Sequence, residues 1–85
     1  MLFRSDLKVA RERLARAAAE VASLEGALAK VIDSLEAAAR GGDGSVLVSL
    51  GVEHEAVSAQ LHGAEERWLD AQARLEELEC LVAPA

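Results

Sequence analysis

The sequence is poor in the residues that build enclosed chemical sites. Its 85 residues include one Cys, one Pro, one Trp, one Phe and no Tyr. A single cysteine, Cys80, excludes a disulfide within the chain and any cluster of cysteine ligands. A chain of this length is also short for a monomeric enzyme with a pocket of its own. We therefore expect contact rather than catalysis, with no cofactor and no small-molecule substrate.

Motifs for metal or nucleotide chemistry are also missing. There is no HExxH run, no calcium-loop spacing and no group of cysteines, and His54 and His62 are too far apart to share one helical turn. The glycine-rich stretch at 41–44 lacks the Gly-Lys-Ser/Thr that holds a nucleotide phosphate. We predict that the protein is not an enzyme and holds no metal.

Long apolar runs are absent as well. No stretch is apolar enough to span a bilayer, and no charged leader precedes an apolar segment. The expected location is therefore the cytoplasm, without membrane contact. The net charge of −6 argues against a surface that binds polyanions all over. Positive side chains are nevertheless concentrated near the start of the chain.

What the sequence does have is Ala, Leu, Val and Glu at coiled-coil spacing. Apolar residues recur at alternating intervals of three and four on both sides of the glycine-rich stretch. The first set is Leu7, Ala10, Leu14, Ala17, Val21, Leu24, Leu28, Val31, Leu35 and Ala38, and the second is Leu47, Leu50, His54, Val57, Leu61, Ala64, Trp68, Ala71, Leu75, Leu78 and Val82. Such spacing gives an α-helix one narrow apolar seam.

These patterns predict an all-α fold: a two-helix antiparallel coiled-coil hairpin. One domain is expected over residues 1–85, with helices at about 4–40 and 46–82 and a turn at about 41–45. Gly41 suits the left-handed position that ends the first helix. Asp43 or Ser45 can cap the second helix.

The register of the two helices can also be predicted. If the chain reverses at the glycines, Leu7 faces Leu78, and large seam residues tend to face small ones along the open half. Facing large residues with small ones keeps the helix spacing constant and fills the seam. The same register brings the side chain of Glu20 within reach of Arg67.

Apolar residues outside the seam predict a second contact surface. They are Ile32, Val48, Val52 and Leu69. A lone hairpin leaves them in water, and a small scaffold gains little stability from a single seam. We expect self-association, most simply a dimer that forms a four-helix bundle, or docking on a partner protein. Simple exposure to solvent is the alternative.

Basic residues form the only cationic candidate. They are Lys8, Arg11, Arg13, Arg16, Arg67 and Arg74, which the register brings to the open end of the hairpin. Acidic residues lie nearby, and no aromatic side chain is available to stack on bases if Trp68 is in the seam. Any contact with DNA or RNA is therefore expected to be weak and sensitive to salt. The alternative is that these cations only balance the acidic end of the second helix.

One stretch goes beyond a generic coiled coil. The segment at 49–79 contains the run Ala64-Glu65-Glu66-Arg67-Trp68-Leu69, after a start with Leu47, Leu50, Gly51 and Glu53. In these features it resembles the C-terminal coiled-coil domain of Uup-type ABC-F ATPases. The resemblance implies a helical hairpin that serves as an accessory arm and contacts nucleic acid or the ribosome. The ATP-binding cassettes of that family are not in this sequence, so the resemblance implies no ATPase activity here. The alternative function is a structural or adaptor hairpin that self-associates or pairs with a partner protein.

Overall fold

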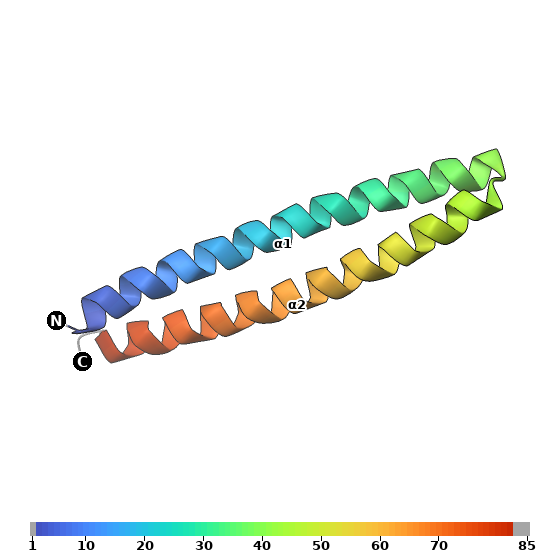
Figure 1. The fold of residues 1–85 in the computed structure, drawn as a ribbon. Coiled ribbons are helices and arrows are strands. Elements are labelled where there is room, and N and C mark those ends of the chain that lie inside the picture. The colour runs from blue at the N-terminus through green and yellow to red at the C-terminus, as the bar shows by residue number, and fades with distance from the viewer. Residues whose placement is uncertain (1, 83–85) are drawn as a thin grey trace.

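Two long helices make up the structure. The computed structural model describes residues 2–82, with side chains from residue 4 onward, so residues 1 and 83–85 of the predicted domain lie outside the described range. Helix α1 spans Leu2–Gly41 and helix α2 spans Gly44–Val82. They lie side by side and antiparallel in a rod of 63 × 18 × 14 Å (Figure 1). The predicted all-α hairpin is confirmed, and each helix extends slightly further than the sequence indicated.

The turn is shorter than predicted, and its left-handed residue is Gly42 rather than Gly41. Gly42 has φ of 74°, whereas Gly41 is still part of α1. The backbone N–H of Gly42 donates to the carbonyl oxygen of Ala38 at 3.0 Å, which satisfies one of the carbonyls left unpaired at the helix end. The expectation for Gly41 is wrong by one residue. Either glycine can adopt a positive φ, so the sequence alone does not choose between them.

Asp43 caps α2. Its Oδ1 accepts hydrogen bonds from the backbone N–H of Val46 at 3.2 Å, the hydroxyl of Ser45 at 3.0 Å and the backbone N–H of Ser45 at 3.1 Å. The carbonyl of Asp43 in turn accepts the N–H of Leu47 at 3.1 Å, so the first helical turn is fully formed. The hydrogen bonds from Val46 and Ser45 hold the pKa of Asp43 below its ordinary value of 3.8. Of the two predicted caps, Asp43 is the one used.

The seam between the helices is the predicted one. Its buried residues are Leu7, Ala10, Ala17, Val31, Ala64, Ala71 and Leu78. The remaining predicted seam positions are half-buried, except Val82, which is 41% exposed in the last turn of α2. Leu7, Ala10 and Leu78 form a cluster with Leu75 packed against it, which confirms the predicted register at the open end.

This seam makes a thin core. Among the described residues, no large side chain is fully buried. Leucines at the centre of the seam, such as Leu24 and Leu61, still retain contact with solvent. A single row of interlocking side chains between two helices cannot enclose its members on every side, because a domain core normally has a second layer. The hairpin therefore has apolar surface to spare.

Candidate interaction surfaces

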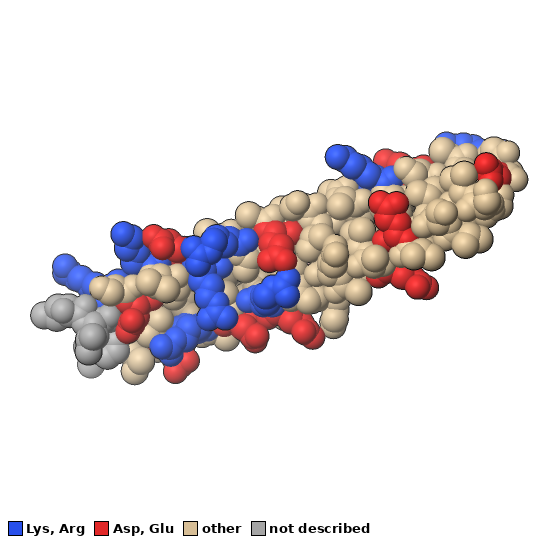
Figure 2. All heavy atoms as spheres, in the orientation of Figure 1, with Lys and Arg blue, Asp and Glu red and all other residues tan. Residues whose placement is uncertain are grey.

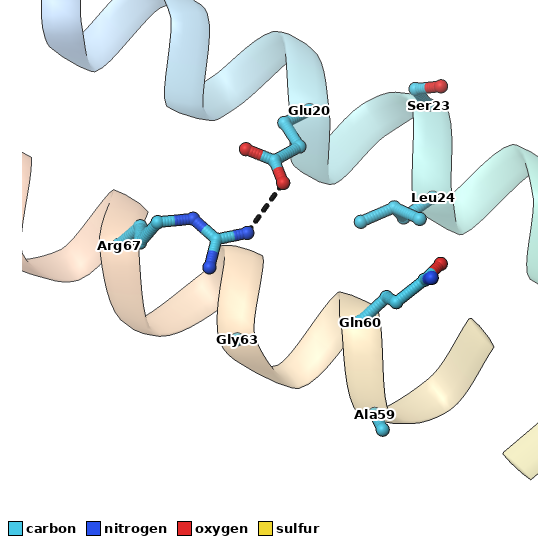
Figure 3. Close-up of a pocket in the computed structure, with 7 residues that line it drawn as sticks. All are labelled: Glu20, Ser23, Leu24, Ala59, Gln60, Gly63 and Arg67. Carbon is cyan, nitrogen blue, oxygen red and sulfur yellow. Dashed lines mark hydrogen bonds and ion pairs between the residues drawn. The ribbon is translucent and has the colours of Figure 1, made fainter. Parts of the chain in front are cut away.

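The hairpin has two broad faces, one on each side of the seam. One face carries an ion pair between the helices: Oε1 of Glu20 in α1 lies 2.5 Å from Nη2 of Arg67 in α2 (Figure 3). The register predicted this pair. Both side chains are about half exposed, at 46% and 57%, so the pair stabilises the fold by only ~0.2–1 kcal/mol. We call this side of the hairpin the charged face.

Shallow grooves run along the charged face. The one in Figure 3 encloses about 480 Å³ and is lined by Glu20, Ser23, Leu24, Ala59, Gln60, Gly63 and Arg67. It is open to solvent, and its walls combine polar side chains with the apolar Leu24 and Ala59. A site for a small molecule normally buries most of its ligand, and catalysis benefits from the exclusion of water. The groove offers neither, although the expected lack of enzyme activity stays a prediction.

The six predicted cationic residues do not form one patch. On the charged face, Arg13 and Arg16 line a groove with Arg67, and Arg74 lines a neighbouring groove that also contains Arg13. Lys8 belongs to the opposite face, because its helical position lies on the other side of the seam from that of Glu20. Arg11 lies on that opposite face for the same reason. Figure 2 shows that Lys and Arg side chains gather in the half of the rod near the termini, with acidic side chains among them.

Acidic partners already engage part of this cationic set. Arg67 is paired with Glu20, and Nη1 of Arg74 lies 3.4 Å from Oε2 of Glu77. Within residues 4–82, no ion pair involves Arg13 or Arg16. The charged face thus presents a mixed surface rather than a purely basic one, and nucleic-acid binding stays a prediction.

The predicted apolar residues are strongly exposed. Ile32 is 39% exposed, Val48 69%, Val52 65% and Leu69 57%. Four further exposed residues lie outside the predicted set: Val9, Val46, Leu81 and Val82. Val9, Val46 and Leu81 also lie off the heptad stripe, so the same pattern in the sequence predicts their exposure.

Three of the predicted residues share the face opposite the charged one. Helical periodicity places Ile32 of α1 and Val48 and Leu69 of α2 on this side, whereas Val52 lies one heptad before Ala59 and so belongs to the outer edge of the charged face. The same side of α1 carries the exposed alanines Ala15, Ala18, Ala22 and Ala29. We call this surface the apolar face. It combines a smooth alanine strip on one helix with larger apolar side chains on the other, and it also carries charged residues of both signs, such as Lys8 and Glu65.

Other kinds of site are not evident in the described chain. Between residues 2 and 82, no cluster of His, Cys, Asp and Glu could hold a metal ion. Neither helix is long and apolar enough over its described residues to cross a membrane. Cys80 is exposed on α2.

Comparison of the chain with protein-family models, curated proteins and solved structures gives no match. The resemblance to the ABC-F arm therefore rests on the quoted residues alone, and no family is assigned. At the level of fold, the chain is a two-helix antiparallel hairpin with exposed apolar residues.

Proposed function

We propose that this chain is a non-enzymatic interaction module that binds a helical protein segment through its apolar face. The observation that carries the proposal is the 57% exposure of Leu69 beside the alanine strip of α1, with Val48, 69% exposed, on the same face nearer the turn. Burial of a large apolar side chain contributes ~1.5–3 kcal/mol, so these two residues offer a partner substantial binding energy. The alanines allow a partner helix to approach closely, because they project little from the backbone.

The thin core supports the same function. Leu24 and Leu61 lie in the seam and still contact solvent. A helix that covers the apolar face shields the edge of this seam and supplies the second layer that the hairpin lacks. Association thus stabilises the hairpin itself, and partner binding is coupled to its stability.

Site-specific photo-crosslinking tests this function. A photoreactive amino acid at position 69 should capture a protein partner in the cell, whereas one at position 19 should not. Ala19 is a matched control because it is exposed on the outer edge of α1, away from the apolar face. Equal capture from the two positions, or no capture from either, would contradict the proposal.

Weak nucleic-acid contact is a second candidate. It is favoured by Arg13 and Arg16, which have no ion-pair partner within residues 4–82 and line a groove on the charged face. It is also the contact that the ABC-F resemblance implies. Binding should be indifferent to sequence, with a salt slope that reflects about two to four phosphate contacts.

Fluorescence anisotropy with labelled DNA and RNA, at low and moderate salt, measures this contact. Arg13→Ala with Arg16→Ala should weaken binding, while Arg40→Ala, a charge lost at the far end of α1, should not. Tight binding at moderate salt, or equal loss from all these changes, would rule out this surface.

A further inference from the structure

The function proposed above leaves the partner open, and the inference here rests on it. We infer that the partner is a second copy of this chain. Two hairpins pack through their apolar faces into a four-helix bundle, with both turns at the same end. In this arrangement α1 of each copy runs antiparallel to α2 of the other.

Surface area is the first argument. The chain of 9.0 kDa has an accessible surface of 6096 Å². A compact monomer of that mass exposes about 4,900 Å². The excess of about 1,200 Å² is larger than the ~800 Å² that each partner contributes to a standard stable interface. The surface that the hairpin exposes beyond that of a compact monomer is therefore enough for one side of a stable dimer interface.

Charge complementarity fixes the orientation. With both turns at one end, α1 meets α2 of the second copy in the same register that the helices have within one hairpin. Lys8 then faces Glu76 of the second copy, and Arg4 faces Glu79 of the second copy. By symmetry each contact occurs twice. The basic start of α1 and the acidic end of α2 thus complement each other across the interface, which selects this register over others.

Side-chain size agrees with the same orientation. Leu69 meets Ala15 of the second copy, and Ile32 meets Gly51 of the second copy. In the opposite arrangement, with the turns at opposite ends, Leu69 would lie beside Glu55 of the second copy. Val48 would also lie beside a carboxylate there, that of Glu76 of the second copy. With both turns at one end, Val48 still meets Glu36 of the second copy, but Leu69 does not meet a carboxylate. Large residues facing small ones give the better packed interface.

Carboxylates on the apolar face limit the affinity. Glu25 and Glu65 are exposed there and have no basic residue opposite them in the dimer. Partial desolvation of like charges opposes association. The dimer is therefore expected to dissociate in the micromolar range, and Glu65→Gln should tighten it by about threefold to tenfold.

Sedimentation equilibrium of the complete chain tests the dimer. The unmodified protein should change from monomer to dimer as its concentration rises through the micromolar range. Lys8→Glu should weaken the dimer about tenfold, as should Glu76→Lys, and the two changes together should restore it. Lys30→Glu is the matched control, because Lys30 lies on the other side of α1, and it should leave the dimer unchanged. Circular dichroism confirms that each variant keeps its helices.

Disulfide trapping tests the orientation. In a Cys80→Ser background, a chain with Ala15→Cys is mixed with a chain that carries Leu69→Cys. A crosslinked heterodimer should form on mixing, and neither chain should crosslink well to itself. Ala22→Cys alone serves as the control, because position 22 meets its own symmetry mate only when the turns are at opposite ends. Self-crosslinking of Ala22→Cys without the heterodimer would overturn the orientation.

The outcomes separate this inference from the proposed function. A chain that stays monomeric at several hundred micromolar overturns the dimer. If position 69 still captures a different protein by photo-crosslinking, the proposed function stands without the dimer. A dimer that persists in Leu69→Glu with Val48→Glu contradicts the use of the apolar face and hence both proposals.

Discussion

Ala64 offers the sharpest test of the seam. Its side chain is 0% exposed, and the register sets it opposite Val21 of α1. Ala64→Leu adds an isopropyl group where no space remains, and such overpacking costs ~1–3 kcal/mol. For a domain of this size, 1 kcal/mol lowers the Tm by about 4–8 °C. A loss of ~2 kcal/mol therefore predicts a fall in Tm of about 10 °C or more in thermal melts followed by circular dichroism.

The control is Ala73→Leu, the same substitution at an exposed position of α2. It should change the Tm by less than about 2 °C, because Ala and Leu differ little in helix propensity. Val21→Ala should then relieve part of the cost of Ala64→Leu, since it returns volume to the same layer. Equal changes in Tm from the substitutions at positions 64 and 73 would refute the placement of Ala64 in the seam. A double variant whose losses simply add would refute the pairing of Ala64 with Val21.

Three further predictions concern the turn and the ion pair. Gly42→Ala should lower the free energy of unfolding by ~1 kcal/mol in chemical denaturation because Gly42 has a positive φ, whereas Gly41→Ala should not destabilise the protein. A larger loss from Gly41→Ala would show that Gly41 is the left-handed residue. The pKa of Asp43 is lowered by folding, so its contribution to stability is present above pH 3.8 and is lost as the pH falls through the folded value. The Tm advantage of the unmodified protein over Asp43→Asn should therefore shrink below about pH 4, and a gap that is constant with pH would contradict this. Arg67→Glu should cost less than ~1 kcal/mol at low salt and almost nothing in 1 M salt; a large effect that persists in high salt would show that the ion pair does more than this exposure allows.

The seam and its register were predictable because they depend on side-chain volume and on the spacing of apolar residues along each helix. Burying one stripe per helix requires the three–four spacing, and setting Leu7 against Leu78 follows from reversal at the glycines. The ion pair of Glu20 with Arg67 was a consequence of the same register. These features need no information beyond the chain itself.

Other features depended on choices that the sequence leaves nearly equal in energy. Gly41 and Gly42 can both adopt a positive φ, and the structure uses Gly42. Val82 has the right spacing for the seam but lies in the last turn of α2 and is 41% exposed. The basic residues divide between two faces because Lys8 and Arg11 have heptad positions on the other side of the seam from Arg13. Their proximity in sequence suggested a single patch. The sequence predicted self-association or docking on a partner protein, and the heptad pattern of one chain does not choose between the two.

Small-angle X-ray scattering tests association through the apolar face, because it reports mass and length together. At high concentration the scattering mass should reach twice the 9.0 kDa of the chain while the long dimension stays near the 63 Å of one hairpin. Side-by-side association through the apolar face doubles the mass without lengthening the rod. A mass of one chain at every concentration, or a doubled mass with a much longer particle, would contradict it.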